Sequence, residues 1–351
     1  MTAQSEGDLS SPVQLSVCIV TGRRSVLLDS CLASLQAQED PPTYELLVAA
    51  DADSDVEEVV RARFPDAVVR PGHGHPGAAR NVLLHEAQGE WLVFLDDDVV
   101  VERHLLRHVV DLASAHPEAD VLGGPNLTPP GSTLFQIVQG AVLASIVAAG
   151  PVRRRYGFHP SGAVDERFFT LCNLAVRRRV MLPFPPELVC AEENAVLAEL
   201  ARRGSQMQYD PALAVFHERR DTYPGFARQM RKYGRGRGQL IRRNWRTARL
   251  AHFTPTAILA YVIALPLLVM ATPALALGLA GYLLAVAISS TVIVKTLRSR
   301  RLRSWPLAFV LTMTLHVCYG WGVAWGLVGR RRAAPTGTDS QPGTRLGAVS
   351  R

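Results

Sequence analysis

Three consecutive aspartates, Asp96, Asp97 and Asp98, follow the apolar run WLVFL and are the residues best placed to do chemistry. A strand that delivers adjacent carboxylates to a sheet edge makes a hard oxygen site for Mg²⁺ or Mn²⁺, and such an ion neutralises a diphosphate. Without a cation the three charges would repel one another. A solvated turn between a strand and a helix would also explain an isolated DDD, so the neighbouring motifs decide between the two.

The segment HPGAARN, residues 75–81, precedes the aspartates and offers groups that bind phosphate or ribose oxygens. Arg80 and Asn81 can donate hydrogen bonds to such oxygens, and Gly77 permits a close approach of the backbone. We therefore interpret this segment and the aspartates as parts of one site.

A second acidic segment, AADADSD, ends the apolar run YELLV. Its first aspartate, Asp51, can accept hydrogen bonds from a nucleobase or a ribose at the end of a strand. Asp53 and Asp55 stand next to VEEVV, and we interpret both as helix N-caps.

Two glutamates, Glu192 and Glu193, begin the amphipathic segment EENAVLAELARRG. Acidic residues favour a helix N-terminus, which would explain them without a function. A transferase, however, needs a base near the acceptor hydroxyl, and a carboxylate desolvated in a cleft suits that role. His217 follows in AVFHERR, where it could serve a metal, a phosphate or only the structure. The sequence thus offers two candidate bases and a third candidate metal ligand beside Asp96 and Asp98.

The segment QMRKYGRGRG, residues 229–238, combines Gln229, Lys232 and Tyr233 with glycines and several cations. This composition suits a flexible lid over a diphosphate, and an anchor on anionic lipid explains the charges nearly as well. We expect Gln229, Lys232 and Tyr233 to contact the donor.

The elements that must position these residues form an α/β domain over residues 14–250. Apolar runs of strand length alternate there with segments of helical period, which predicts a mostly parallel, Rossmann-like sheet with helices on both faces. In such sheets ligands bind beyond the carboxyl ends of the strands. The predicted strands are 15–21, 44–51 and 91–98, and the predicted helices are 26–38, 56–64 and an apolar, buried or membrane-grazing helix over 134–150.

Long apolar runs fill residues 255–328, for which we expect two or three transmembrane helices. The stretch from Thr254 to Val294 carries no charge and is long enough for two helices that each cross ~30 Å of hydrocarbon, with the turn at Thr272 and Pro273. A third run covers residues 305–328. It would place the arginines after it outside the cell, against the positive-inside rule, unless it is re-entrant or lies in the interface.

The net charge of +7 is concentrated at residues 228–249 and 295–303, which border the apolar runs. That placement favours a membrane over nucleic acid, for which the sequence has no binding motif. The five cysteines lack metal-ligand spacing, and the N-terminus lacks a secretory signal. We expect a multi-pass plasma-membrane protein with a cytoplasmic catalytic domain and disordered segments at 1–13 and 333–351.

These motifs together resemble the inverting glycosyltransferases of family 2, which have the GT-A fold, over about residues 13–245. The matching pieces are SVCIVTGRR, AADADSD, HPGAARN, FLDDD, the EE pair and VFH, in that order. The resemblance is strongest to the membrane-associated branch that builds succinoglycan-type exopolysaccharides, which has a similar arginine- and glycine-rich segment.

The resemblance implies a role for individual residues. Asp51 would bind the nucleobase, and Asp96 and Asp98 would flank the DxD site, with Asp98 as the direct metal ligand. Glu193 stands where the family has its catalytic Asp, and Glu192 remains a candidate. The family's QxxRW motif maps to Gln229, Lys232 and Tyr233, where Lys replaces Arg and Tyr replaces Trp.

We therefore expect an inverting transfer from a nucleotide-diphosphate sugar, a UDP-sugar by preference, to a hydroxyl of a lipid-linked or polyprenyl acceptor. Two other hypotheses remain open. A nucleotidyltransferase on a similar fold would release diphosphate in place of a nucleoside diphosphate. A non-enzymatic membrane scaffold with a degenerate donor site would fit the Glu-for-Asp and QxxKY departures.

Overall fold

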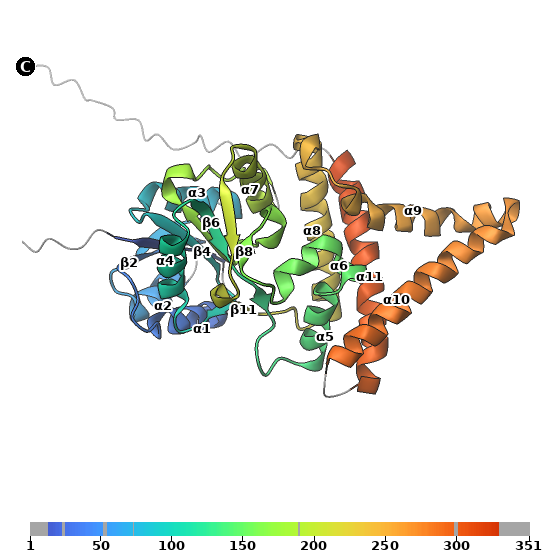
Figure 1. Cartoon of the computed structure of the whole chain (residues 1–351), viewed down its shortest axis with the longest axis horizontal. Helices are drawn as coiled ribbons and strands as arrows, with labels where there is room; N and C mark the ends of the chain where they lie inside the picture. The colour runs from blue at the N-terminus through green and yellow to red at the C-terminus, as the bar shows by residue number, and fades with distance from the viewer. Residues whose placement is uncertain are drawn as a thin grey trace, which may run out of the picture.

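The computed structural model describes residues 13–22, 25–51, 55–72, 74–188, 190–297 and 301–329. The chain forms an α/β part from which helices project (Figure 1). The predicted cap residue Asp53 and the predicted disordered tail at 333–351 lie outside the described residues, as do residues 1–12. Asp55 does hold the N-cap position of its helix, but its side chain makes no capping hydrogen bond.

An eight-stranded mixed sheet, in the order β3-β2-β1-β4-β9-β6-β10-β8, forms the centre of the α/β part. Its strands are β1 (Leu15–Thr21), β2 (Tyr44–Ala50), β3 (Val68–Pro71), β4 (Trp91–Asp96), β6 (Ala119–Gly123), β8 (Gly162–Ala163), β9 (Asn173–Arg177) and β10 (Gln206–Tyr209). Strands β1 to β4 pair in parallel, whereas β9 runs antiparallel between β4 and β6. The predicted strands and the mostly parallel sheet are confirmed.

Helices cover both faces of this sheet, as the sequence predicts. They are α1 (Ser25–Gln36), α2 (Val56–Arg63) and α4 (Leu105–Ala115) on one face, with α3 (Pro76–Glu86) and α7 (Glu192–Arg202) on the other. The central strands are buried on both sides because successive side chains alternate between the faces. In β1, Val17 and Ile19 join the core under α1, while Cys18 joins the core under α3.

A second, three-stranded sheet brings the late VFH segment to the aspartates. It consists of β5 (Val99–Val101), β7 (Asn126–Leu127) and β11 (Val215–His217), in the order β5-β11-β7. The antiparallel pairing of β5 with β11 sets His217 opposite Val99. Because Val99 follows Asp98 directly, this register places His217 beside the end of the DDD motif.

The segment at 134–150, predicted as a buried or membrane-grazing helix, is partly buried and is not one helix. It forms α5 (Leu134–Leu143) and α6 (Ile146–Ala149), followed by the 3₁₀ helix η1 (Gly150–Tyr156), with a bend of 62° at the break. Val138, Val142 and Ala148 pack into one apolar cluster with later helices. By length and composition the bent pair passes as a broken span or a re-entrant loop. The other short 3₁₀ helices are η2 (Glu166–Phe168), η3 (Arg178–Val180), η4 (Pro211–Leu213), η5 (Trp245–Thr247) and η6 (Pro273–Leu275).

The arginine- and glycine-rich segment lies inside one continuous helix, α8 (Tyr223–Arg243), so the prediction of a flexible lid is wrong. Its glycines allow close packing. A Cβ atom at Gly234 or Gly238 would overlap the backbone of the last described helix, α11 (Arg301–Val328). Packing between small residues lets two helix backbones approach in this way. The pair α8 and α11 forms the most extensive contact between any two described elements.

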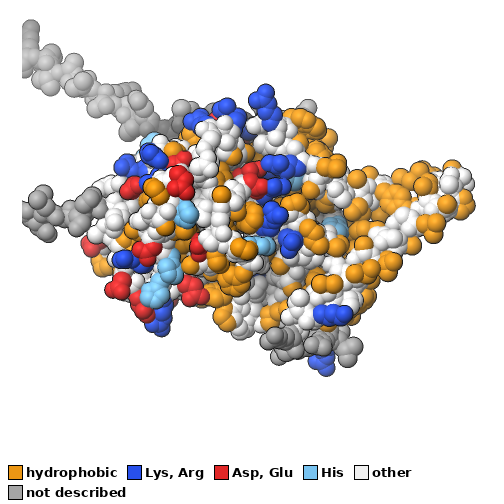
Figure 2. Space-filling view, in the orientation of Figure 1, with side chains coloured by type: hydrophobic (Ala, Val, Ile, Leu, Met, Phe, Trp, Pro, Cys, Tyr) orange, Lys and Arg blue, Asp and Glu red, His pale blue; other side chains and the backbone are white. Residues whose placement is uncertain are grey.

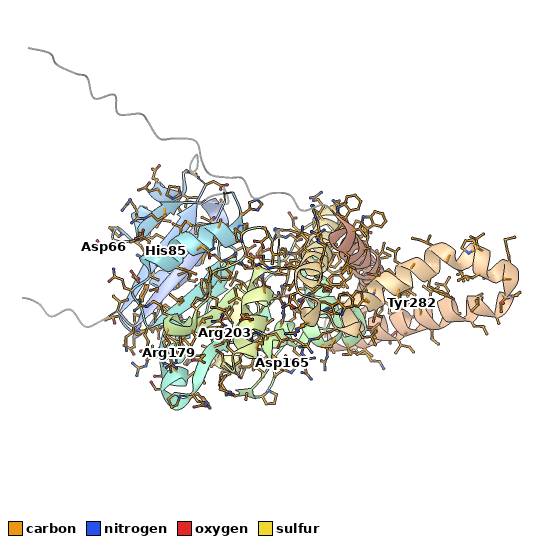
Figure 3. All side chains as sticks on the ribbon, turned by 90° about the horizontal axis from the view of Figure 1, so that it is seen from above. Asp66, His85, Asp165, Arg179, Arg203 and Tyr282 are labelled. Atoms are coloured by element: carbon orange, nitrogen blue, oxygen red, sulfur yellow. The ribbon has the colours of Figure 1, made fainter. Side chains whose placement is uncertain are left out.

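Two apolar helices, α9 (Leu250–Ala271) and α10 (Ala276–Thr296), form a hairpin that projects from the rest of the protein (Figures 1 and 3). The chain turns at Thr272 and Pro273, as predicted. Hydrophobic side chains cover most of this hairpin (Figure 2). Within the part of the chain that the structure describes, three helices are long and apolar enough to cross a membrane. The buried share of the span rises from 6% in α9 to 28% in α10 and 50% in α11.

We predict that Gly238→Ala destabilises the protein and that Gly281→Ala does not. The new methyl group at 238 would meet the backbone of α11 at Val323, an overpacking that costs about 1–3 kcal/mol. Gly281 on α10 has open space around it, so alanine there can only favour the helix. Thermal unfolding in one detergent checks this, and equal midpoints for the two variants would contradict the close α8–α11 packing.

Candidate active site

A cavity of about 1200 Å³ begins at the carboxyl ends of β1, β2 and β4 and reaches the α9–α10 hairpin. It collects almost all of the site residues predicted from the sequence. These are Asp51, Arg80, Asp96, Asp98, Glu192, Glu193, His217, Gln229, Lys232 and Tyr233. The sheet edge supplies its acidic wall, and α7 and α8 supply the facing walls.

Asp96, Asp98 and His217 form a cluster in which one ligand atom from each residue lies within 4.8 Å of the others. His217 Nε2 lies 2.9 Å from Asp98 Oδ1. Burial is the largest single effect and lowers the pKa of His217, but the charges of Asp98 and Cys172 and the hydrogen bonds to them together outweigh it and raise the pKa to about 10. Asp97 does not join the cluster, because its Oδ2 accepts a hydrogen bond of 2.6 Å from the Thr21 hydroxyl.

The surroundings of this cluster fit a divalent cation. Asn126 Nδ2 lies 2.9 Å from His217 Nδ1, and Asn126 Oδ1 is buried without a hydrogen-bond partner among the described residues. Rotating the amide exchanges its oxygen and nitrogen. Oδ1 would then accept a hydrogen bond from Nδ1–H, the tautomer that leaves Nε2 free to bind a metal. Two carboxylates beside that nitrogen are ligands that Mn²⁺ and Mg²⁺ accept.

Arg80 lies between the metal-site aspartates and the candidate bases. Its side chain is 9% exposed, with Nη1 2.7 Å from Glu192 Oε1 and Nη2 3.5 Å from Asp96 Oδ1. Burial raises the pKa of Asp96, and the positive charge of Arg80 opposes that rise. The guanidinium expected to grip phosphate or ribose is thus held by two carboxylates at the cavity wall.

Asn81 and Gly77 are not brought to the cavity. Asn81 Nδ2 donates a hydrogen bond of 2.8 Å to the carbonyl oxygen of Phe184. Asn81 Oδ1 accepts one of 2.7 Å from the backbone N–H of Phe184. A Cβ atom on Gly77 would lie 3.0 Å from the carbonyl oxygen of Pro185. The segment HPGAARN therefore fixes the loop before α7, and only Arg80 of the expected contacts lines the site.

Glu192 and Glu193 diverge at the start of α7, where Ala191 has a left-handed backbone with φ of 68°. A non-glycine residue in this region is strained, and such strain is concentrated at functional sites. Glu192 pairs with Arg80, whereas Glu193 Oε1 accepts a hydrogen bond of 2.5 Å from Asn194 Nδ2. Burial, and then the charge of Glu192, raise the pKa of Glu193.

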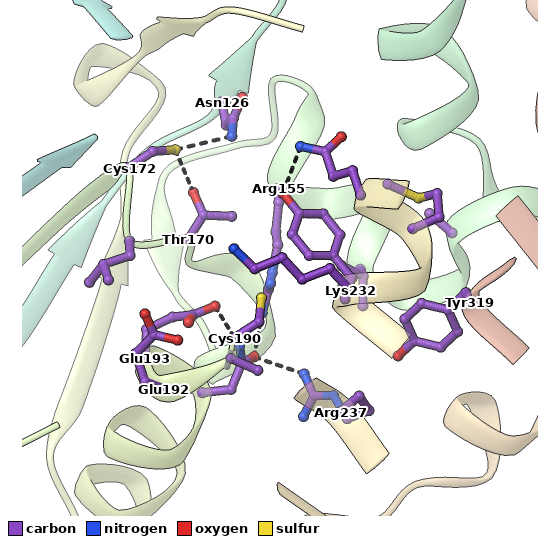
Figure 4. Close-up of a pocket in the computed structure, with 18 of the residues that line it drawn as sticks. Asn126, Arg155, Thr170, Cys172, Cys190, Glu192, Glu193, Lys232, Arg237 and Tyr319 are labelled. Carbon is purple, nitrogen blue, oxygen red and sulfur yellow. Dashed lines mark hydrogen bonds between the residues drawn. The ribbon is translucent and has the colours of Figure 1, made fainter. Parts of the chain in front are cut away.

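Gln229, Lys232 and Tyr233 lie on the face of α8 that lines the cavity, at the i, i+3 and i+4 spacing that one helix face requires. Gln229 Nε2 donates a hydrogen bond of 3.2 Å to the Tyr233 hydroxyl. Lys232 points from α8 into the cavity (Figure 4). Helix α8 is not a lid, but this face of it brings the Lys232 cation to the cavity wall opposite the sheet edge.

The cavity lining also includes many residues that the sequence analysis did not single out, among them Asn126, Arg155, Asn194 and Arg237, which bond to site residues or to one another. Two of these four had a signal in the sequence, because Asn194 directly follows the EE pair and Arg237 belongs to the QMRKYGRGRG segment. Asn126 and Arg155 have no local motif. They reach the site through β7 and η1, whose positions depend on the tertiary fold.

Known proteins show the same domain. Residues 16–180 match the family model described as glycosyl transferase family 2. Succinoglycan biosynthesis protein ExoO of Rhizobium meliloti is 26% identical over 200 residues, which cover 54% of this chain and 56% of that protein. Succinoglycan biosynthesis protein ExoM of the same organism is 29% identical over 226 residues, which cover 54% of this chain and 71% of that protein. The chain thus spans little more than half the length of ExoO.

A solved structure extends the likeness in fold beyond the family match. Mannosyltransferase PcManGT from Pyrobaculum calidifontis, in complex with GDP-Man and Mn²⁺, aligns with a TM-score of 0.56 at 16% identity. The alignment covers 92% of this chain and 91% of that one. Residues 16–180 therefore match a glycosyltransferase family 2 domain, and the chain has a GT-A-like fold followed by apolar helices that are candidate membrane spans.

Proposed function

We propose that this chain transfers a sugar, with inversion, from a nucleoside diphosphate sugar to a hydroxyl of a lipid-linked acceptor. The observation that carries the proposal is a single cavity that contains both the Asp96/Asp98/His217 cluster and Glu193. A donor diphosphate held at the cluster and an acceptor hydroxyl held at Glu193 would meet inside this cavity.

On the donor side, Asp96, Asp98 and His217 would hold Mn²⁺ or Mg²⁺. The ion would supply positive charge to the diphosphate and to the leaving nucleoside diphosphate. Asp51, exposed at the end of β2, would accept hydrogen bonds from the nucleobase or ribose. Lys232 would contact the diphosphate from α8. The GDP-Man and Mn²⁺ bound to the archaeal mannosyltransferase support this arrangement, and a UDP-sugar is our preferred donor.

On the acceptor side, Glu193 is the better candidate for the base. Glu192 is committed to a buried ion pair with Arg80, whereas Glu193 pairs with no cation among the described residues. A carboxylate whose pKa is raised is a stronger base when ionised, and general bases work best with a pKa near the operating pH. The Glu193 carboxylate would take the proton of the acceptor hydroxyl. The hydroxyl oxygen would bond to the anomeric carbon, and the bond from that carbon to the diphosphate oxygen would break in the same step.

The membrane helices support a lipid-linked acceptor and a plasma-membrane location with the catalytic domain on the cytoplasmic side. We infer that the α9–α10 hairpin enters the bilayer and that α11 lies at its surface. Contacts run along α8 and α11 in the same direction, from Tyr223 beside Thr314 to Arg242 beside Gly329. If α11 crossed the bilayer, the cations of α8 would have to enter with it, at roughly 2.5 kcal/mol or more each. The names of ExoO and ExoM support a role in polysaccharide synthesis.

The direct test is hydrolysis of the donor by the purified full-length protein. A panel of UDP- and GDP-sugars is incubated with Mn²⁺, with Mg²⁺ and with a chelator, and the products are separated. We expect metal-dependent release of free sugar and nucleoside diphosphate from one donor. Release of diphosphate would identify a nucleotidyltransferase, and the absence of turnover with every donor would favour a scaffold.

We predict that Asp98→Ala removes metal-dependent donor hydrolysis and weakens Mn²⁺ binding by at least tenfold, the loss already seen for residues that only orient metal ligands. Asp120→Ala is the matched control, because Asp120 is paired with the exposed Arg179 at the other end of the sheet. Calorimetric Mn²⁺ titration and circular dichroism check binding and folding separately. Near-normal Mn²⁺ affinity in Asp98→Ala would show that the metal site lies elsewhere.

We predict that Glu193→Gln lowers turnover by roughly 10²-fold or more, the scale of a lost general base, while donor binding survives. Glu192→Gln should reduce turnover less and thermal stability more, because it weakens the buried pair with Arg80. Turnover, the donor KM and the unfolding midpoint are measured for both variants. A larger loss of turnover in Glu192→Gln would exchange the two roles.

The pH profile gives an independent prediction. Burial and the charge of Glu192 raise the pKa of Glu193, while Arg155 and Arg237 lower it, with a net rise above the ordinary value of 4.5. Because the base must be ionised, kcat/KM should fall as the pH drops through this raised pKa, on an acid limb above pH 4.5. The limb should move to lower pH in Glu192→Gln, which removes the neighbouring negative charge. Saturating Mn²⁺ keeps the metal site from setting the limb, and an unmoved limb would exclude Glu193 as its source.

A further inference from the structure

The cavity does not end at the candidate base. Beyond Glu193 it continues to the membrane helices, where its lining becomes apolar. This end is formed by Ile146, Val147, Pro255, Ile258 and Leu315. These residues come from α6, α9 and α11, the elements at the base of the hairpin. The cavity thus joins the sheet edge to the base of the apolar hairpin.

Two arginines lie between the base and the apolar end of the cavity. Arg155 Nη2 and Arg237 Nη2 each donate a hydrogen bond of 2.9 Å to the same atom, Asn194 Oδ1 (Figure 4). They come from different elements, η1 and α8, so two distant segments converge on one neutral oxygen. Asn194 in turn donates to Glu193, which connects the arginines to the base.

Neither guanidinium forms a salt bridge with a carboxylate among the residues that the structure describes. By contrast, Arg249 at the same end of the cavity lies 2.7 Å from Glu166 Oε1. Glu193 is the carboxylate that acts on both guanidiniums, through space and without a salt bridge, so one negative charge faces two cations. Arg155 is 7% exposed, and two cations side by side repel each other, so a further anion between them would stabilise both.

We propose that Arg155 and Arg237 bind the diphosphate of a lipid diphosphate-linked saccharide, the acceptor of the proposed transfer. The proposal rests on the proposed function and specifies its acceptor. The saccharide would extend toward Glu193, and the lipid would follow the apolar end of the cavity to the hairpin. Arginine suits this role because its planar donors match phosphate oxygens.

A bare polyprenyl phosphate fits this arrangement less well. Its phosphate oxygen would itself be the nucleophile, and a phosphate monoester is already largely ionised at neutral pH. Such an acceptor would need no base, whereas the structure places Glu193, with its raised pKa, next to the arginine pair. An acceptor that carries both a hydroxyl and a phosphate group uses both features.

The two arginines also lie on the wrong side of Glu193 for the donor. The donor diphosphate belongs at Asp96 and Asp98, where Lys232 is the cation that faces the cavity from α8. Arg237 follows Lys232 by more than one helical turn and bonds to Asn194 on the far side of the base. The two cations on this face of α8 therefore serve different substrates. Lys232 would face the donor, and Arg237 would face the acceptor.

The test uses the detergent-solubilised full-length protein and the variant Arg237→Gln. Arg237 is chosen because it is only half-buried, whereas Arg155 is fully buried and its loss could impair folding. Arg231→Gln on the same helix is the control, because Arg231 is exposed and does not line the cavity. We expect Arg237→Gln to raise the KM for a lipid diphosphate-linked saccharide by roughly tenfold or more, the scale of one charge-assisted hydrogen bond. The donor KM should stay unchanged.

Binding of farnesyl diphosphate, measured by calorimetry at fixed free Mn²⁺, tests the anion site without any turnover. Wild type and Arg231→Gln should bind it tightly, and Arg237→Gln should bind it at least tenfold more weakly. Farnesyl monophosphate and inorganic diphosphate should bind less well than farnesyl diphosphate, while farnesol should not compete. Inorganic diphosphate binding as tightly as farnesyl diphosphate would overturn the lipid part of the proposal.

The outcomes separate this proposal from the proposed function. If no donor is hydrolysed but farnesyl diphosphate still depends on Arg237, the anion site stands and the transferase does not. If donors are hydrolysed and Arg237→Gln changes only the donor KM, the arginines serve the donor and the acceptor site is wrong. An unchanged acceptor KM and unchanged farnesyl diphosphate binding in Arg237→Gln would overturn the proposal outright.

Discussion

The geometry of the site depends on the buried guanidinium of Arg80, because it joins carboxylates from two distant parts of the chain. Asp96 comes from the end of β4 and Glu192 from the start of α7, and Arg80 contacts both. Removing one partner of such a buried pair costs about 3–5 kcal/mol, because the remaining charge is left without a counter-ion. The contact with Arg80 also distinguishes the positions of Glu192 and Glu193. Since Glu192 is held by Arg80, Glu193 is left to face the wall formed by α8.

The wall of the cavity opposite the sheet is formed by α8, and α8 packs against the C-terminal apolar helices. The position of this wall therefore depends on those helices. One face of α8 presents Lys232 and Arg237 to the cavity, and Gly234 and Gly238 pack on α11. A shift of α11 would therefore displace cations in the cavity. The predicted boundary at residue 250 separates a polar from an apolar sequence, but the contacts of α8 with α11 cross it. Close backbone packing of this kind requires glycine. It therefore explains why α8 contains several glycines, without invoking a flexible segment.

Local patterns predicted the parts of the structure that local interactions determine. Apolar runs marked the strands, and the carboxylates that end them, Asp51 and Asp96, do line one cavity. The break after α5 escaped prediction, because Ala144 and Ser145 carry no helix-breaking signal and the bend follows the packing of α6 against later helices. Asn81 was misplaced for a related reason. Its amide is equally suited to a phosphate or to a backbone, and the backbone of Phe184, in the loop before α7, forms both of its hydrogen bonds.

In the proposed transfer, each end of the cavity binds its own phosphate group. At the sheet edge a divalent cation at Asp96 and Asp98 would hold the donor diphosphate, with Arg80 and Arg220 beside the two carboxylates. At the far end Arg155 and Arg237 would hold the diphosphate of the acceptor, which carries no metal. Glu193 lies between the two ends, one residue from the Arg80 pair and one hydrogen bond from Asn194, where the hydroxyl of one substrate would meet the anomeric carbon of the other.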